Sequence, residues 1–163
     1  MTDDSLTPFF RPRGIVVIGA SREPTKLGYG MARNLVLSGY TGAIHFVNPN
    51  GGELFGRPIY TDVQAVPDPV DLAVILTPAP TVAGVLRQCG GRGIRGAIVS
   101  SGGFRETGPA GAALERELGA VAEEFGLRFI GPNCVGMMDL HLPFDTTFLQ
   151  PPAPPAGDVA FVS

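Results

Sequence analysis

Short apolar runs alternate along the chain with segments in which apolar side chains recur every three or four positions. The apolar runs have the length and composition of buried β-strands. They span residues 14–19, 43–49, 71–78, 96–101 and 127–133. Between them the helical period predicts helices over residues 27–38, 79–88 and 109–125. This alternation predicts an α/β fold with a Rossmann-like, doubly wound parallel sheet in three layers.

The sequence pattern adds detail to the first predicted helix and to one connection. In the first predicted helix Leu27, Met31 and Leu35 share one face. The connection over residues 51–69 is rich in proline and glycine and predicts at most a short helix. The strands are apolar on both faces, as a sheet covered by helices on both sides requires.

The chain has 163 residues, which is enough for one domain with a substantial core. The segment "LQPPAPPAGD" has the composition of a stiff linker, and the apolar "VAFVS" that follows it is typical of a new strand. We therefore expect one ligand-binding domain over residues 1–150. Residues 151–163 would be a Pro-rich linker and the start of a following domain.

Charge and cysteine content exclude several classes of partner. The formal net charge is −3 at pH 7, which argues against a nucleic-acid surface. No apolar run approaches the ~20 residues of a membrane span, and the acidic N-terminus "MTDDSLTPFF" is not a signal peptide. Cys89 and Cys134 lack the paired spacing of a metal site. We expect a cytoplasmic protein with reduced thiols and no nucleic-acid or membrane partner.

The turn after the first strand carries the main candidate chemistry. Parallel sheets bind ligands at the carboxyl ends of their strands, and this turn supplies Gly19, Ser21, Arg22, Glu23, Pro24 and Lys26. It precedes a helix whose free N–H groups favour an anion, and Arg22 and Lys26 add positive charge. The dinucleotide fingerprint G-x-G-x-x-G is not met, because the next glycine after Gly19 is Gly28. The turn predicts a ligand with several phosphates; an ordinary polar surface loop is the alternative.

The second and third strand ends offer polar and rigid groups. The second strand ends in Asn48, Pro49 and Asn50, with no carboxylate where an NAD enzyme holds the ribose. Turn formation is the alternative role for these asparagines. Pro78 and Pro80 follow the third strand. They would present an apolar edge to an adenine or a pantetheine arm, or simply begin a helix.

The last two strand ends are rich in small residues. The fourth strand is followed by Ser100, Ser101, Gly102 and Gly103, whose backbone amides we expect to approach a ligand closely. A plain loop is the alternative. After the fifth strand, "GPNC" places Asn133 at a tight polar tip.

Taken together, "IGAS", "VNP", "TPAP", "SSGGFRE" and "GPNCVG" resemble, in this order, the coenzyme A-binding domain of the succinyl-CoA synthetase α-subunit superfamily. The closer resemblance is to NDP-forming acyl-CoA synthetases of the acetate–CoA ligase type, and it covers roughly residues 9–163. It implies coenzyme A or acyl-CoA as the ligand, with the first turn facing its phosphates.

The resemblance also implies roles for the candidate residues. Residues 21–24, with Lys26 near by, would line the nucleotide end of coenzyme A, and residues 48–51 would flank its adenosine. Residues 78–80 and 100–102 would follow the pantetheine, with Asn133 close to the thiol. The family often has a lysine where this chain has Asn50. Arg22 and Lys26 are the candidates to replace that phosphate partner.

In the resembling enzymes a carboxylic acid and a nucleoside triphosphate give an acyl phosphate, a histidine shuttles the phosphoryl group, and the thiol of coenzyme A takes the acyl group. The resemblance places these steps in ATP-grasp and phosphohistidine domains of the same or a partner chain. Neither His45 nor His141 matches the shuttling histidine. We therefore predict no catalytic residue and no metal ligand here, and expect the isolated chain to be inactive.

Two other functions stay open at this point. One is a stand-alone or regulatory coenzyme A-binding module, for example one fused to a protein acetyltransferase. The other is an NAD(P)-binding Rossmann domain, against which the missing second glycine and the missing acid count. The sequence also leaves open the acyl group, the choice between ADP and GDP, and the oligomeric state, including a homo-oligomer.

Overall fold

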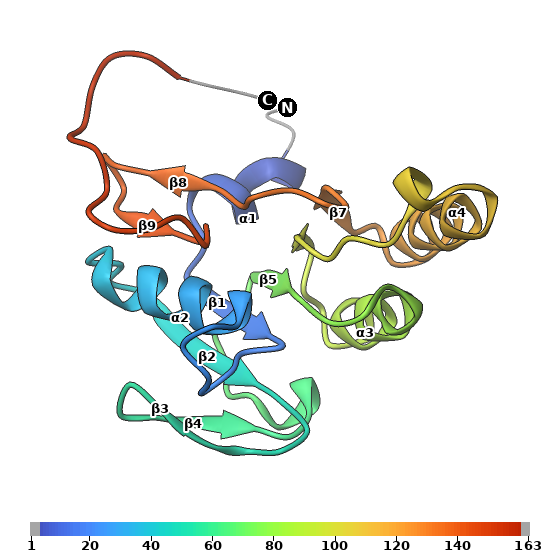
Figure 1. The fold of residues 1–163 in the computed structure, drawn as a ribbon, viewed down its shortest axis with the longest axis horizontal. Coiled ribbons are helices and arrows are strands. Elements are labelled where there is room, and N and C mark those ends of the chain that lie inside the picture. The colour runs from blue at the N-terminus through green and yellow to red at the C-terminus, as the bar shows by residue number, and fades with distance from the viewer. Residues whose placement is uncertain (1–3, 161–163) are drawn as a thin grey trace.

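The computed structural model describes residues 4–160, built around one seven-stranded sheet (Figure 1). Its strands are β1 (Gly14–Ile18), β2 (Ala43–Val47), β3 (Gly52–Leu54), β4 (Arg57–Tyr60), β5 (Leu72–Ile75), β6 (Gly96–Val99) and β7 (Arg128–Ile130). They lie in the order β3-β4-β2-β1-β5-β6-β7. Every neighbouring pair is parallel except β3–β4. The chain winds outward from β1 in both directions, which confirms the predicted doubly wound sheet.

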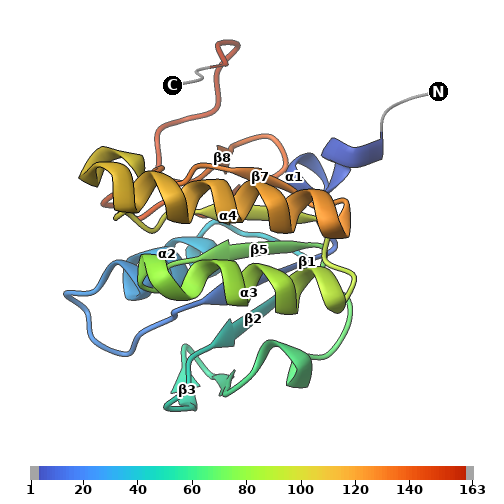
Figure 2. The same cartoon turned by 90° about the vertical axis from the view of Figure 1, so that its right-hand side faces the viewer.

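Helices cover both faces of the sheet (Figures 1 and 2). One face carries α3 (Ala79–Gly91) and α4 (Pro109–Phe125). The other carries α2 (Leu27–Leu37), the short α1 (Thr7–Phe10), and a small hairpin of β8 (Met138–Asp139) and β9 (Phe144–Asp145). The predicted three layers are therefore present. A 3-10 turn also precedes α1, and two others lie in connections: η1 (Asp4–Leu6), η2 (Val63–Ala65) and η3 (Arg105–Thr107).

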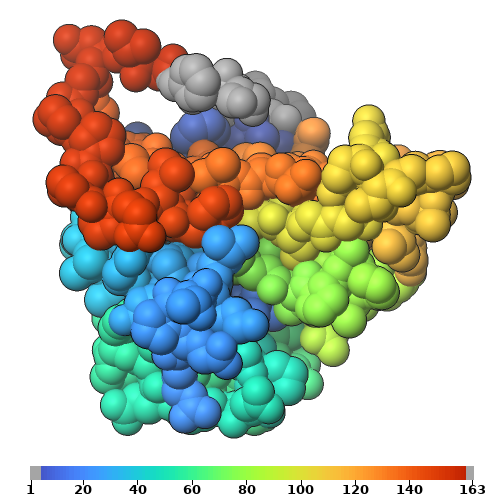
Figure 3. Space-filling view, viewed as in Figure 1, coloured from blue at the N-terminus to red at the C-terminus, as the bar shows by residue number. Residues whose placement is uncertain are grey.

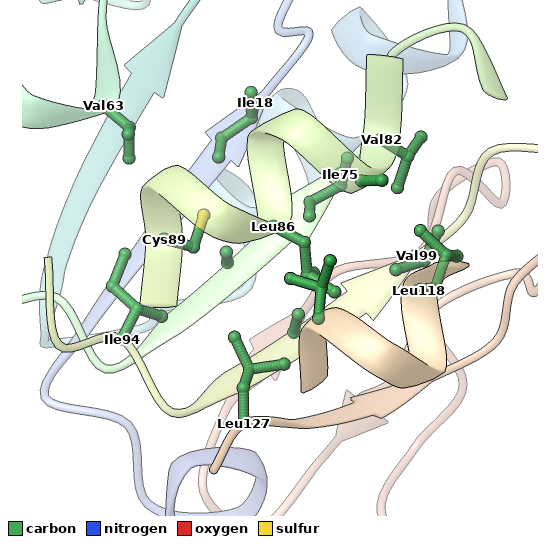
Figure 4. Close-up of a cluster of buried hydrophobic side chains, with 14 of the residues drawn as sticks. Ile18, Val63, Ile75, Val82, Leu86, Cys89, Ile94, Val99, Leu118 and Leu127 are labelled. Atoms are coloured by element: carbon green, nitrogen blue, oxygen red, sulfur yellow. The ribbon is translucent and has the colours of Figure 1, made fainter. Parts of the chain in front are cut away.

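Two buried clusters hold the layers together. Alternate residues of β1 point to opposite faces, so that Val16 joins the cluster under α3 and α4 while Val17 joins the one under α2. Figure 4 shows the first cluster, to which α3 contributes Leu86 and α4 contributes Leu118, both with no exposed surface. Fully burying one such side chain stabilises a fold by about 1.5–3 kcal/mol.

The prediction for residues 51–69 was wrong in one respect. The segment holds the antiparallel hairpin β3–β4 before the short 3-10 turn η2. Strands of three and four residues show too little alternation to be recognised, and Pro58 argues against a strand. Pro58 is tolerated because the parallel pairing of β4 with β2 involves only Ile59 and Tyr60.

The face of α2 that carries Leu27, Met31 and Leu35 is buried only in part. Met31 and Leu35 are fully buried, but Leu27 is 53% exposed. It is the first residue of α2 and lines a cleft at the edge of the sheet rather than the core.

The Pro-rich segment from residue 151 to residue 160 is exposed and contains no helix or strand. Of the strand predicted over 159–163, Val159 and Ala160 are exposed coil, and residues 161–163 lie outside the described part. The predicted boundary at residue 150 stays a prediction. Among the described residues, no helix has both the length and the apolar content needed to cross a bilayer.

Candidate functional site

Two adjoining hollows lie at the carboxyl ends of the parallel strands. The main cleft has a volume of about 810 Å³, within the usual range for cofactor sites. It is lined by the turn after β1, the ends of β2, β4 and β5, one face of α3, and Ser100, Ser101 and Gly102 after β6. The smaller side pocket, of about 240 Å³, is lined by Ala20, Ser21, Arg22, Glu23, Asn48, Asn50, Gly51 and Ile59. In Figure 3 the turn after β1 (blue) stands out from the face of the molecule, above the hairpin segment (turquoise) and beside α3 (green).

Two glycines bring the first turn close to the sheet. Gly19 has φ +95°, and a Cβ there would lie 2.7 Å from the carbonyl oxygen of Leu76. A Cβ on Gly28 would overlap the carbonyl oxygen of Gly19. These residues therefore serve the tight turn and the close helix packing that a dinucleotide fingerprint assigns to its first and last glycines. Ser21 stands where the middle glycine would be.

The polar groups of this turn are free to meet an anion. The Ser21 Oγ accepts a hydrogen bond from the Glu23 N–H at 3.0 Å, which leaves its own proton for a ligand. The side chains of Arg22 and Lys26 have no hydrogen bond or ion pair within residues 4–160. No side chain caps the first turn of α2. An anion at a helix N-terminus gains about 0.3–1 kcal/mol, and a charge-assisted hydrogen bond contributes about 1.5–3 kcal/mol.

Asn48 joins the first two loops. Its Nδ2 donates to the carbonyl oxygen of Ala20 at 2.8 Å, and its Oδ1 accepts from the Asn50 N–H at 3.0 Å. The turn role considered for this asparagine is therefore present. Asn48, Pro49 and Asn50 still line the main cleft, so Asn48 shapes its wall through bonds within the protein.

The loop after β6 is held from within. The Glu106 carboxylate accepts hydrogen bonds from the N–H groups of Gly103 at 2.6 Å and Phe104 at 3.1 Å. These bonds lower the pKa of Glu106 below its usual range. The Gly103 amide is therefore already hydrogen-bonded within the loop, and its approach to a ligand stays a prediction. Ser100, Ser101 and Gly102 do line the main cleft.

Most of the predicted binding residues come together here, but three do not line either hollow. Pro24 is exposed on the first turn, and Pro80 is an exposed residue in the first turn of α3. Asn133 donates its N–H to the carbonyl oxygen of Ser101 at 3.0 Å. Its Oδ1 would be 3.3 Å from a Cβ on Gly102. Asn133 therefore borders the cleft beside the glycine loop.

The structure adds lining residues that the sequence analysis missed, in the segment after β4 and on one face of α3. They are Thr61, Asp62, Val63, Thr81, Val85 and Gln88. The first three were hidden because β4 was not predicted. The others follow a helical spacing of four and three, which would have marked them once α3 was placed at the cleft.

No group of three metal-ligating side chains occurs among the described residues. His45 lies half-buried in β2, edge-on to Tyr60, and burial lowers its pKa. His141 lies on the exposed turn between β8 and β9, with its Nε2 3.1 Å from the carbonyl oxygen of Gly157. The Cys134 Sγ is 3.9 Å from the Ser100 Oγ, beside the cleft.

Comparison with known proteins gives this geometry a context. The family model described as the CoA binding domain matches residues 13–139. The ADP-forming acetate–CoA ligase II subunit alpha of Pyrococcus furiosus is 43% identical over 95% of this chain, which spans 33% of that relative. The ADP-forming 4-hydroxybutyrate–CoA ligase of Nitrosopumilus maritimus is 34% identical over the whole chain, which spans 23% of it.

A solved structure has the same fold. It is the dinucleotide forming acetyl-coenzyme A synthetase 1 of Ca. Korarchaeum cryptofilum in complex with phosphate and ADP. It superposes with a TM-score of 0.83 at 40% identity, covering 88% of this chain and 30% of that one. The chain thus spans about a third or less of the relatives named here.

Proposed function

The chain belongs to the CoA binding domain family, and on that premise we propose that it is the coenzyme A-binding part of an ADP-forming acyl-CoA synthetase. The observation that carries this proposal is the uncapped N-terminus of α2 at the main cleft, with two cations beside it that have no partner in the described structure. Such an arrangement fits a ligand with several phosphates.

The residues present suggest a layout for the ligand. The Ser21 hydroxyl, Lys26 and the N–H groups of α2 would meet the pyrophosphate, and residues 48–51 would flank the adenosine. Pro78, Leu76 and Val85 give the main cleft an apolar wall suited to pantetheine. Ser100–Gly102 and Asn133 would then lie toward the thiol. Coenzyme A supplies the thiol that accepts the acyl group, and this chain's residues bind and orient it.

The remaining steps would belong to other parts of the enzyme. We propose ATP-grasp and phosphohistidine domains, in the same or a partner chain, as the sites of acyl phosphate formation. ADP rather than GDP is favoured by the names of the relatives. Those relatives are similar along this whole chain yet differ in their acyl group, acetate in one and 4-hydroxybutyrate in the other. This supports an acyl specificity determined mainly outside this chain.

Calorimetric titration of the chain with coenzyme A, dephospho-coenzyme A and NAD at one salt concentration tests the proposal. We expect coenzyme A to bind, dephospho-coenzyme A to bind more weakly and NAD not to bind. Lys26→Gln should weaken coenzyme A by about tenfold or more, the value of one charge-assisted hydrogen bond. Arg116→Gln, on the exposed face of α4, is the matched control and should change nothing. Binding of NAD without coenzyme A would contradict the proposal.

A further inference from the structure

The turn between β3 and β4 holds an unusual residue. Phe55 and Asn133 are the only residues other than glycine with positive φ in the described part of the chain. Asparagine adopts this conformation readily, whereas a bulky aromatic residue does so at a cost. Phe55 (φ +51°) precedes Gly56 (φ +72°), which is the pattern of a two-residue hairpin turn that prefers Asn-Gly. An observed strain of this kind calls for a function.

The Phe55 ring has an aromatic neighbour. It packs against Tyr29 in the first turn of α2, with ring centroids 5.2 Å apart and the planes tilted by 54°. The residue as a whole is 37% exposed. The contact joins the tip of the hairpin to the helix whose N-terminus faces the main cleft.

The other end of the hairpin lies against Arg22. A Cβ on Gly52 would be 3.3 Å from Nη1, 3.4 Å from Cζ and 3.6 Å from Nε of Arg22. The guanidinium therefore lies over the bare backbone of Gly52. Since Arg22 has no hydrogen bond or ion pair in the described structure, packing on the hairpin sets its direction.

The two free cations serve different hollows. Lys26 lines the main cleft and not the side pocket, whereas Arg22 lines the side pocket and not the main cleft. Coenzyme A carries its phosphates in two places, a pyrophosphate and a separate 3′-phosphate monoester. Glu23 is the other charged residue of the side pocket, so its formal charges cancel. Because the net charge of the side pocket is zero, its selectivity for a phosphate depends on the direction of the Arg22 guanidinium.

We propose that the Arg22 guanidinium recognises the 3′-phosphate monoester and that the β3–β4 hairpin holds it in place. The backbone of this hairpin at Gly52 is the seat on which the guanidinium packs. Phe55 is a positioning residue that fixes the seat to α2. The inference rests on the proposed coenzyme A site. Gly52 leaves room for the guanidinium, and the Phe55–Tyr29 contact keeps the hairpin against the helix. The ligand is thereby distinguished from nucleotides that lack a phosphate at this position.

The test is the ratio of the dissociation constants of dephospho-coenzyme A and coenzyme A, measured by calorimetry on the 163-residue chain. We expect a ratio of about ten or more, as one charge-assisted hydrogen bond provides. Arg22→Gln should bring it to about one. Phe55→Asn keeps the turn conformation but removes the ring. This variant should lower the ratio several-fold, because it weakens the binding of coenzyme A and not that of dephospho-coenzyme A. Tyr29→Leu should have the same effect.

The double variant separates positioning from a direct contact. In the Arg22→Gln background, Phe55→Asn should have no further effect, because the group it positions is gone. Leu37→Ala, an exposed apolar residue at the far end of α2, is the control and should leave the ratio unchanged. A thermal melt of each variant accompanies the titration.

Three results would overturn the inference. If Phe55→Asn keeps the wild-type ratio while coenzyme A still binds, the seat is wrong and the proposed function stands. If Phe55→Asn weakens both ligands equally and lowers the melting temperature, its role is structural only. If the wild-type chain binds no coenzyme A, the inference and the proposed function fail together.

Discussion

At the residue scale, the cleft is divided between side chains that build it and side chains left for a ligand. The side chains of Asn48 and Glu106 form hydrogen bonds with backbone groups of the loops around them. Arg22 and Lys26 have no such partner in the described structure. Polar groups bound within the protein fix the walls, and only the free ones gain new partners on binding. Residue type alone did not separate the two groups.

We expect the half-buried His45 to make the folded chain less stable in mild acid. Burial, followed by the charge of Arg92, lowers the pKa of His45, while a hydrogen bond with the Pro69 backbone raises it in part. Arg57 and Asp68 act on the ring as well, in opposite directions. Since the folded pKa lies below the unfolded value near 6.5, the unfolded chain binds the proton first. Stability is then complete above that pH and falls as the pH drops towards the folded pKa.

Urea unfolding between pH 7.5 and 5 checks this prediction, with His45→Gln as the matched variant. The wild-type free energy of unfolding should fall faster than that of His45→Gln, by at most about 1.4 kcal/mol per pH unit and by less for a half-buried ring. Taking the difference between the two proteins removes the contribution of other titrating groups. Asp145 is one of them, because burial raises its pKa. Equal slopes would show that His45 titrates alike in both states.

At the element scale, the approach of α2 to β1 is the most sensitive contact of the site. A Cβ on Gly28 would overlap the Gly19 carbonyl oxygen and lie 3.3 Å from the Ser21 backbone nitrogen. We expect Gly28→Ala to destabilise the chain by about 2 kcal/mol or more through steric overlap and to weaken coenzyme A binding. Gly84→Ala in α3 meets nothing within 4 Å and should stabilise it by about 0.5–1 kcal/mol. Paired urea melts and titrations would contradict the prediction if both variants behaved alike.

The elements also show what the sequence can and cannot predict. The five apolar runs and the helices between them were predicted in the right order, because parallel strands and amphipathic helices differ clearly in period. The hairpin β3–β4 was not, because its strands are short and its turn contains Phe55 where Asn is expected. Without the hairpin, neither Asp62 at the cleft nor the contact of Gly52 with Arg22 was visible. The expectation that a ligand binds at the carboxyl ends of parallel strands located most of the cleft. It did not predict the lining residues that come from one face of α3.

At the scale of the whole molecule, the cleft collects segments from residue 18 to residue 102, and no single element holds it. A ligand bound there contacts the ends of several strands and two helices at once, so binding should stabilise the entire sheet. Coenzyme A at 100 times its dissociation constant is expected to raise the free energy of unfolding by about 2.7 kcal/mol. For a chain of this size, the melting temperature should rise by about 5–10 °C.

Thermal unfolding with increasing coenzyme A measures this coupling. NAD at equal concentration should leave the melting temperature unchanged, and Arg22→Gln should need more coenzyme A for the same rise. Because the linkage requires only that the folded state binds and the unfolded state does not, the rise has to follow the dissociation constant from calorimetry. Tight binding without a rise in melting temperature would mean that the ligand also binds the unfolded chain, and that the site does not depend on the folded sheet.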